Sequence, residues 1–214
     1  MPIAVILVEP EIGENIGFVA RAMRCYGLTD LRIVTTSPLP DAMFRTGSSA
    51  REILENCVVF STLQEAIAPF TEVIAFSRRP SSFTLPHISL QDLSLSSTEH
   101  TALLFGRESQ GLFQGEIALA TKICEIPLVA STMSLNLGQA VATALYHLSS
   151  VPLSDTESPL ATSEERQALF SLLQRENQFL EKGSRKEQLS TMIAKMELSS
   201  DELSMFMGVI KGLK

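Results

Sequence analysis

The sequence predicts an α/β protein: a mostly parallel sheet with helices on both faces, followed by a small helical extension. Three observations support this prediction. The chain opens on a continuous apolar run, Ile3–Val8, as expected for a parallel strand that is covered on both faces. Strand-like and helix-like segments then alternate to about residue 150, which indicates crossover units. Beyond a segment rich in Ser, Thr and Pro, only helical spacing remains.

The expected strands are short apolar runs bounded by polar or turn residues. They lie at Ile3–Val8, Leu31–Val34, Cys57–Phe60, Val73–Phe76, Ala102–Phe105 and Ile123–Ile126. The helices between them keep apolar residues at helical spacing, and in the first of them Asn15 can form the N-cap and Gly27 the stop. These helices are expected at 15–26, 49–55, 62–68, 114–120 and 134–149. A long polar loop is expected over 77–89.

The change of pattern divides the chain. We expect an α/β domain over residues 1–150, a linker over 151–163 and a helical extension over 164–214. The extension keeps apolar residues at helical spacing over 164–182 and 184–197 and again from about residue 199. It has too little core to be stable alone, so it should pack on the main domain or on a partner subunit.

Composition limits the possible partners. The 214 residues carry 17 Lys and Arg against 24 Asp and Glu, a formal net charge of −7, so nucleic acid gains no long-range attraction and any RNA binding needs a local patch. The candidates for such a patch are Arg21, Arg24, Arg45, Arg51, Arg78, Arg79 and Arg107. The dispersed cysteines and the three histidines lack ligand spacing, so we expect no metal. Without a signal peptide or a long apolar run, we expect a soluble, cytoplasmic protein.

Three polar turns each follow an expected strand and precede an expected helix: Gly13–Gly17, Gly106–Gly111 and Ser134–Leu137. Ligands of parallel sheets bind at this edge, where the first N–H groups of a helix are unpaired. The turns match neither the Walker loop nor the GxGxxG fingerprint. Each has an alternative explanation, since Asn15 and Ser134 could be helix caps and the middle turn could face water.

Taken together, the turns resemble the three ordered motifs of the SPOUT-class (SpoU-type) RNA 2′-O-ribose methyltransferases. The matching segments are Asn15-Ile-Gly-Phe-Val-Ala-Arg21, Leu104-Phe-Gly106-Arg-Glu108-Ser-Gln-Gly111-Leu112, Ile126-Pro127 and Ser134-Leu-Asn136-Leu137. The resemblance covers roughly residues 1–150. It implies a C-terminal trefoil knot, a homodimer, and S-adenosylmethionine as methyl donor in the knot, with no metal.

The resemblance also implies roles for individual residues. Arg21 would activate the ribose 2′-hydroxyl with help from a phosphate, while four further positions shape the catalytic site: Asn15, Glu108, Ser134 and Asn136. The implied cofactor-binding positions are Phe76, Ser77, Arg78, Gly106, Gly111, Ile126, Met133, Ser134 and Leu135. Because an arginine stays charged in proteins, Arg21 should lower the pKa of the hydroxyl and orient it rather than act as a base.

The tail narrows the resemblance. Residues 189–213 are similar to the ending of enzymes that methylate cytidine or uridine at position 32 of the tRNA anticodon loop, so tRNA is the expected partner. Alternatives are ribosomal RNA, another tRNA position, or a knotted RNA-binding protein without catalysis. The last is motivated by Phe76-Ser-Arg-Arg79, where that subgroup has a small, hydroxyl-rich turn; these arginines could instead face RNA phosphate.

Overall fold

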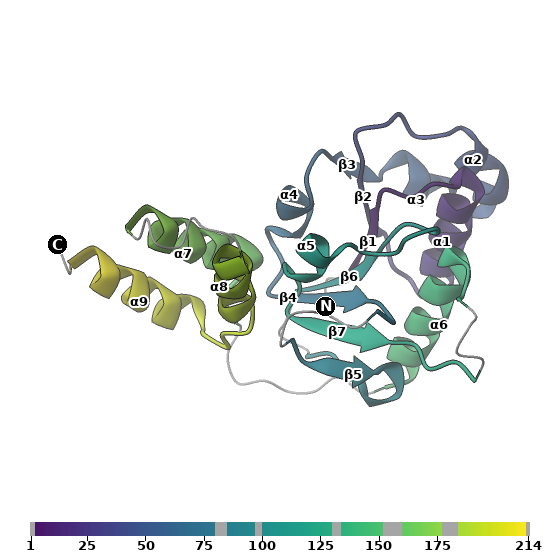
Figure 1. The fold of residues 1–214 in the computed structure, drawn as a ribbon. Helices are drawn as coiled ribbons and strands as arrows, with labels where there is room; N and C mark the ends of the chain where they lie inside the picture. Colours follow the sequence, from purple (N-terminus) through teal and green to yellow (C-terminus); the bar gives the residue numbers. More distant parts are fainter. Residues whose placement is uncertain are drawn as a thin grey trace.

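A computed structural model of the chain describes residues 3–79, 85–96, 100–129, 134–151, 160–176 and 184–212. An α/β domain lies beside a smaller helical group made of α7, α8 and α9 (Figure 1). The strands are β1 Ile3–Val8, β2 Asp30–Val34, β3 Val58–Phe60, β4 Glu72–Phe76, β5 His87–Ser89, β6 Thr101–Phe105 and β7 Lys122–Glu125. The helices are α1 Gly13–Cys25, α2 Ala42–Thr46, η1 Ser48–Ala50, α3 Arg51–Glu55, α4 Leu63–Ile67, η2 Leu90–Asp92, α5 Gln114–Ile117, α6 Leu137–Ser150, α7 Ser163–Glu176, α8 Ser184–Ala194 and α9 Ser200–Gly212.

In the described part of the chain, seven strands form one sheet in the order β3-β2-β1-β6-β4-β7-β5. Every pairing between them is parallel, which confirms the predicted parallel sheet. Because all strands point the same way, the loops that follow β1, β4, β6 and β7 emerge at one edge of the sheet. The strand order is consistent with a C-terminal knot.

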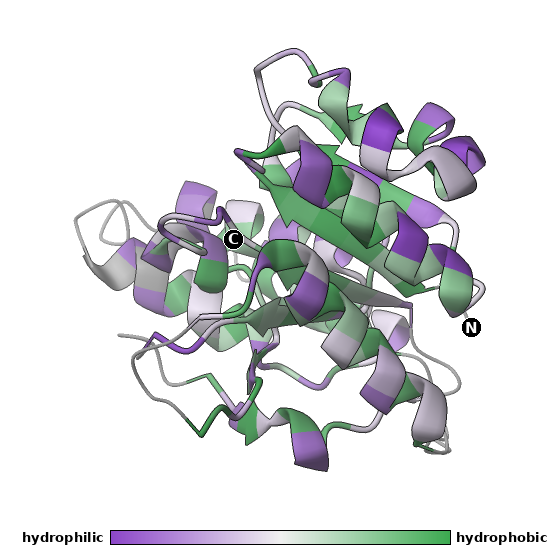
Figure 2. Cartoon of the chain, turned by 90° about the vertical axis from the view of Figure 1, so that its right-hand side faces the viewer, coloured by the Kyte–Doolittle hydropathy of each residue, from purple (hydrophilic) through white to green (hydrophobic). Residues whose placement is uncertain are grey.

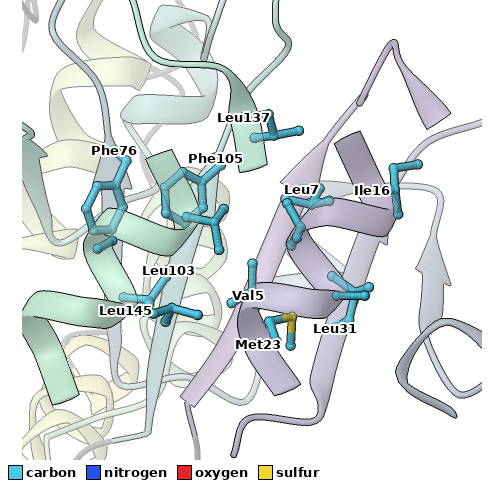
Figure 3. Packing of buried hydrophobic residues seen from close by; sticks show 14 of the residues in the cluster. Val5, Leu7, Ile16, Met23, Leu31, Phe76, Leu103, Phe105, Leu137 and Leu145 are labelled. Atoms are coloured by element: carbon cyan, nitrogen blue, oxygen red, sulfur yellow. The ribbon is translucent and has the colours of Figure 1, made fainter. Parts of the chain in front are cut away.

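Both faces of the sheet are covered, as predicted. Along β1, Val5 and Leu7 join the core under α1, α2, α3 and α6, whereas Ala4, Ile6 and Val8 join the core under α4 and α5. Figure 3 shows the first core, where side chains of the central strands meet those of α1 and α6. Burial of one such side chain contributes roughly 1.5–3 kcal/mol, which is why the strand is apolar at every position. In Figure 2 the strands are mostly coloured as hydrophobic, whereas the helices carry bands of both hydrophilic and hydrophobic residues.

The structure corrects three details of the sequence analysis. Helix α1 begins at Gly13 with Ile12 as its N-cap, so the prediction that Asn15 is the N-cap was wrong; Asn15 is buried in the first turn. Helix α2 lies in a stretch expected to be a loop, and β5 lies inside the expected polar loop, where it pairs with β7. Neither short element has an apolar pattern that would predict it. Contacts with the rest of the fold stabilise both.

The helical extension has a small core of its own. Leu169, Phe170, Leu189, Ile193 and Leu203 are buried between α7, α8 and α9. The helical spacing that predicted this group is therefore confirmed for the described residues of the extension.

The start of α7 ties the extension to the α/β domain. The backbone N–H of Ser163 donates to the carbonyl of Phe70 at 2.6 Å, and that of Glu164 donates to the carbonyl of Ala68 at 2.8 Å. The buried guanidinium of Arg166 donates to the carbonyl of Thr71. The extension thus packs on the α/β domain of its own chain. None of the helices described is both long and apolar enough to cross a membrane.

Candidate active site

The loops after β4, β6 and β7 surround a cavity of about 260 Å³, which we call the loop cavity. It lies at the carboxyl edge of the parallel sheet, where ligands of such sheets bind. The predicted cofactor positions that line it are Phe76, Ser77, Arg78, Gly106, Gly111, Ile126, Ser134 and Leu135. The remaining one, Met133, lies outside the described residues. Residues from distant parts of the chain are therefore brought together as the sequence predicted.

The turn after β6 brings its backbone to the cavity. Arg107 and Gly111 exchange backbone hydrogen bonds, at 3.3 Å from the N–H of Arg107 and 2.8 Å from that of Gly111, so the turn is closed at its base. Gly111 has φ +62°, in the left-handed region that favours glycine. A Cβ on Gly106 would lie 2.2 Å from the carbonyl carbon of Gly111, so only glycine fits there. Both glycines are needed for the closed turn.

An aromatic pair forms a wall of the loop cavity. The ring of Phe76, at the end of β4, stacks on that of Phe105, at the end of β6, with centroids 4.5 Å apart and an angle of 11° between the planes (Figure 3). Phe76 is only 9% exposed, so its ring packs into the core and leaves the cavity open. Cys124 also lines the cavity, and burial raises the pKa of its thiol to about 12, which keeps it neutral and unreactive.

A chain of hydrogen bonds joins the three predicted motifs. The carboxylate of Glu108 accepts from the amide Nδ2 of Asn15 at 2.8 Å, and Oδ1 of Asn15 accepts from Nδ2 of Asn136 at 2.7 Å. Glu108 further accepts the backbone N–H groups of Glu11 at 2.8 Å and Ile12 at 3.2 Å. These side chains are thus engaged with one another. They hold the turns after β1 and β6 and the start of α6 in one fixed arrangement.

Asn136 has a second task as the N-cap of α6. Its Oδ1 accepts the N–H of Gly138 at 2.9 Å, while the side chain of Gln139 accepts the N–H of Asn136 at 3.1 Å. Asn136 is therefore the cap, and the alternative in which Ser134 caps this helix was wrong. Ser134 lies before the helix and lines the loop cavity instead.

Sequence reasoning missed Glu11 and Ser109. The carboxylate of Glu11 accepts from the Oγ of Ser109 at 2.6 Å and from the backbone N–H of Ser109 at 3.0 Å. The backbone N–H of Glu11 in turn donates to the carboxylate of Glu108. The hydroxyl of Ser109, and next its N–H, lower the pKa of Glu11 below the ordinary 4.5. The position of Glu11 in the loop that follows β1 was the signal that could have indicated this contact.

The arginines fall into two groups. Among the described residues, the side chains of Arg21, Arg24 and Arg79 have no hydrogen-bond or ion-pair partner. Arg79 lines the loop cavity, whereas Arg21 is exposed on α1 and does not line the cavity of its own chain. The remaining candidates for RNA contact form ion pairs: Arg45 with Glu14 at 2.8 Å, Arg51 with Glu55 at 2.7 Å, Arg78 with Glu125 at 3.4 Å and Arg107 with Glu116 at 3.0 Å. Arg21, Arg24 and Arg79 therefore form a smaller set of candidates for contact with RNA.

Within the described ranges, no group of three or more His, Cys, Asp or Glu side chains is arranged to hold a metal ion. The loop cavity is lined instead by backbone, apolar side chains, three arginines, and the polar residues Ser77, Glu108, Ser109, Gln110 and Ser134.

Comparisons with known proteins show the family of the chain. A family model described as the SpoU rRNA Methylase family matches residues 2–146. The chain is 37% identical over 174 residues to the uncharacterized tRNA/rRNA methyltransferase LasT of Escherichia coli K12, covering 78% of this chain and 76% of that protein. It is 34% identical over 153 residues to the tRNA (cytidine-2′-O-)-methyltransferase TrmJ of Methanocaldococcus jannaschii, covering 68% and 66%.

A solved structure extends the similarity to the whole chain. The crystal structure of TrmJ from Z. mobilis ZM4 superposes with a TM-score of 0.88 at 32% identity, and the match covers 100% of this chain and 99% of that one. The resemblance inferred from the three turns is confirmed by these findings. The chain belongs to the SpoU rRNA methylase family, within the SPOUT class of methyltransferases.

Proposed function

We propose that this protein transfers a methyl group from S-adenosylmethionine to the 2′-hydroxyl of cytidine or uridine at position 32 of the tRNA anticodon loop. The observation that carries the proposal is the chain of hydrogen bonds that joins the three motifs, two of which also line the loop cavity. Similarity to relatives named tRNA 2′-O-methyltransferases supports the chemistry and the substrate class. Such an enzyme would work in the cytoplasm, where it meets tRNA.

The residues of the loop cavity fit the methyl donor. Phe76 and Phe105 offer an apolar wall suited to an adenine ring, and the closed turn of Gly106 and Gly111 brings backbone groups to the cavity. Ser134 and its neighbour Leu135 line the cavity from the segment before α6. When bound, S-adenosylmethionine supplies a methyl group made electrophilic by its sulfonium.

Arg21 is the residue proposed to prepare the acceptor. Its guanidinium is permanently charged, so it stabilises the developing alkoxide of the 2′-hydroxyl and lowers the pKa of that group. Arg21 would orient the hydroxyl oxygen toward the methyl group that the donor supplies, and an RNA phosphate would accept the proton of the hydroxyl. Alignment of the two groups at roughly 3 Å supplies much of the rate. Asn15, Glu108 and Asn136 act by holding the turns in place.

We infer a homodimer, because Arg21 lies outside the cavity of its own chain. Ile12, Phe18 and Tyr146 expose 47%, 44% and 65% of their surfaces at the start of α1, on α1 and on α6. Large exposed apolar side chains on neighbouring helices are typical of an interface. If a second copy packs there, Arg21 of the partner subunit can reach the loop cavity.

The proposal of the anticodon loop rests on the helical extension, because residues 189–213 resemble the ending of enzymes that methylate position 32. The match to TrmJ from Z. mobilis spans the whole of this chain, extension included. We propose the division into a methyltransferase domain over residues 1–150, a linker over 151–163 and an extension over 164–214. The knot is part of the same proposal, since the strand order is consistent with it.

Two alternative functions predict different results in the experiments. Ribosomal RNA is favoured by the name of the family and by that of the Escherichia coli relative. A protein without catalysis was suggested by the bulky Phe76, but the stacking of this ring on Phe105 leaves the loop cavity open and removes that argument.

The first experiment tests the role of Arg21. Arg21→Ala should lower methyl transfer to tRNA at least ~100-fold, the usual minimum for loss of one group that stabilises a developing oxyanion. Binding of S-adenosylmethionine, measured by calorimetry, and the unfolding midpoint should stay unchanged. The matched control is Arg24→Ala, which removes an equally exposed and unpaired cation from α1. Full activity of the Arg21→Ala variant on a verified substrate rejects the assigned role.

The second experiment identifies the acceptor. Nucleoside mass mapping of tRNA and ribosomal RNA from cells with and without the gene should show one lost 2′-O-methyl group, at position 32 of the anticodon loop. Loss at another position, or in ribosomal RNA, would select the corresponding alternative. Absence of S-adenosylmethionine binding, even with RNA present, would support the non-catalytic protein.

A further inference from the structure

Phe113 is a large apolar side chain exposed beside the loop cavity. It follows Leu112, which lines the cavity and is 2% exposed, and it precedes Gln114, the first residue of α5. Phe113 itself exposes 43% of its surface. The backbone therefore turns from the cavity wall directly into a phenyl ring open to solvent.

This ring is held rigidly from one side. The guanidinium carbon of Arg107 lies 4.1 Å from the centroid of the Phe113 ring, within the range of a cation–π contact. Arg107 is fixed in turn by two 3.0 Å hydrogen bonds to the carboxylate of Glu116 and is only 15% exposed. Glu116 also accepts the backbone N–H of Phe113 at 2.7 Å. The ring thus has a planar, pre-ordered support.

Local stability does not explain a phenylalanine at this position. Phe113 is the N-cap of α5 and makes no side-chain cap bond, whereas Ser, Thr, Asp or Asn would provide one. An exposed ring gains little from burial in the free protein. Residues that break a local rule without a local gain are expected at functional sites.

We propose that Phe113 is a stacking platform for a nucleobase of the RNA substrate, an inference that rests on the proposed function. Bases of single-stranded loops stack on aromatic side chains, and Arg107 behind the ring stiffens the platform. The adenine of the methyl donor is a poorer occupant, because Phe113 does not line the loop cavity. Arg79 does line it, and its side chain has no partner among the described residues, so it can meet the phosphate of the same strand.

The test replaces the ring by the residue that the helix prefers. Phe113→Ser should raise the KM for tRNA about tenfold, the usual scale for loss of one stacked base. The KM for S-adenosylmethionine should stay unchanged, because Phe113 does not line the loop cavity, and the unfolding midpoint should not fall, because serine restores the N-cap. Phe113→Trp should keep the KM for tRNA near that of the wild type. An anticodon stem–loop carrying 2-aminopurine next to the acceptor nucleotide should be quenched by the wild type and not by Phe113→Ser.

Three other results would contradict the proposal that Phe113 stacks on a base. An unchanged KM for tRNA in Phe113→Ser shows that no base stacks on the ring, while the proposed function stands because the wild type still methylates. Dissociation of Phe113→Ser to monomers in sedimentation shows that the ring is a contact between subunits. If the wild type methylates no RNA, the proposed function fails and the platform with it.

Discussion

Asn15, Glu108 and Asn136 show how a conformation is fixed by individual side chains. Asn15 is 3% exposed, and it bonds to Glu108 on one side and Asn136 on the other. A buried polar group that loses its partner costs about 1–3 kcal/mol, so the buried Asn15 depends on both of its partners. The same bonds that stabilise the fold therefore set the shape of the site.

The contact between Glu11 and Ser109 gives a pH-dependent prediction. A carboxyl whose pKa is lowered by folding stabilises the protein above its ordinary pKa, here 4.5, and this stabilisation is lost as the pH falls through the lower folded value. Glu11→Gln should thus be less stable than the wild type at neutral pH, and the difference should shrink below about pH 4.5. Urea unfolding at a series of pH values measures it.

The control for this prediction is Ser109→Ala, which removes the hydroxyl donor and leaves the carboxylate of Glu11 in place. It should reproduce part of the same pH dependence, because the N–H of Ser109 still donates to Glu11. A stability difference for Glu11→Gln that stays constant from neutral to acidic pH contradicts the assigned contact.

The sequence predicts which residue types form the site, but it does not predict which of these side chains bond to one another. The three motifs stand out as polar turns after apolar strands. The bonds between them join Asn15 to Glu108 across 93 positions and to Asn136 across 121, so they exist only in the folded chain. Arg107 looked like a free cation for the same reason, since its ion pair with Glu116 depends on how the turn closes.

The elements differ in how well local sequence determines them. β1 and α1 have continuous or periodic apolar residues, and both were predicted within a few residues of their bounds. β5 has three residues and is held by its pairing with β7, while α2 is a single short turn against α1. Tertiary contacts alone stabilise these short elements, so no local pattern could have indicated them.

The turn after β6 allows a prediction with a matched control. In Gly106→Ala the new Cβ meets backbone atoms of Gly111 and Leu112 at 2.2 and 2.4 Å, which the turn can relieve only by opening. We expect a loss of about 1–3 kcal/mol in the free energy of unfolding and at least tenfold weaker binding of S-adenosylmethionine. Calorimetry and urea unfolding measure the two effects.

Gly115→Ala provides the control, because a Cβ there has no atom within 4 Å. Alanine suits a helix better than glycine, so its stability should be unchanged or raised by up to about 1 kcal/mol, with normal cofactor binding. Equal behaviour of the two variants would mean that the closed turn has no role in binding.

For the whole molecule, the position of Arg21 outside its own loop cavity has a testable consequence. At an S-adenosylmethionine concentration too low to fill the cavity of Gly106→Ala, a chain with Arg21→Ala and a chain with Gly106→Ala should each be nearly inactive alone. In a random mixture of re-associated dimers, half of the dimers pair the two chains, and one of their two sites combines an intact cavity with an intact Arg21. About a quarter of the wild-type methylation should therefore return on mixing. If mixing restores nothing while sedimentation shows mixed dimers, Arg21 does not act across the interface.

The central position of β6 determines when the protein can fold during synthesis. β6 lies between β1 and β4, and Ile3 pairs with Thr101. During synthesis, β1 must wait for roughly a hundred further residues before its second edge is sealed. Until then the nascent polypeptide exposes an unpaired, fully apolar edge, the kind of surface that chaperones protect against aggregation.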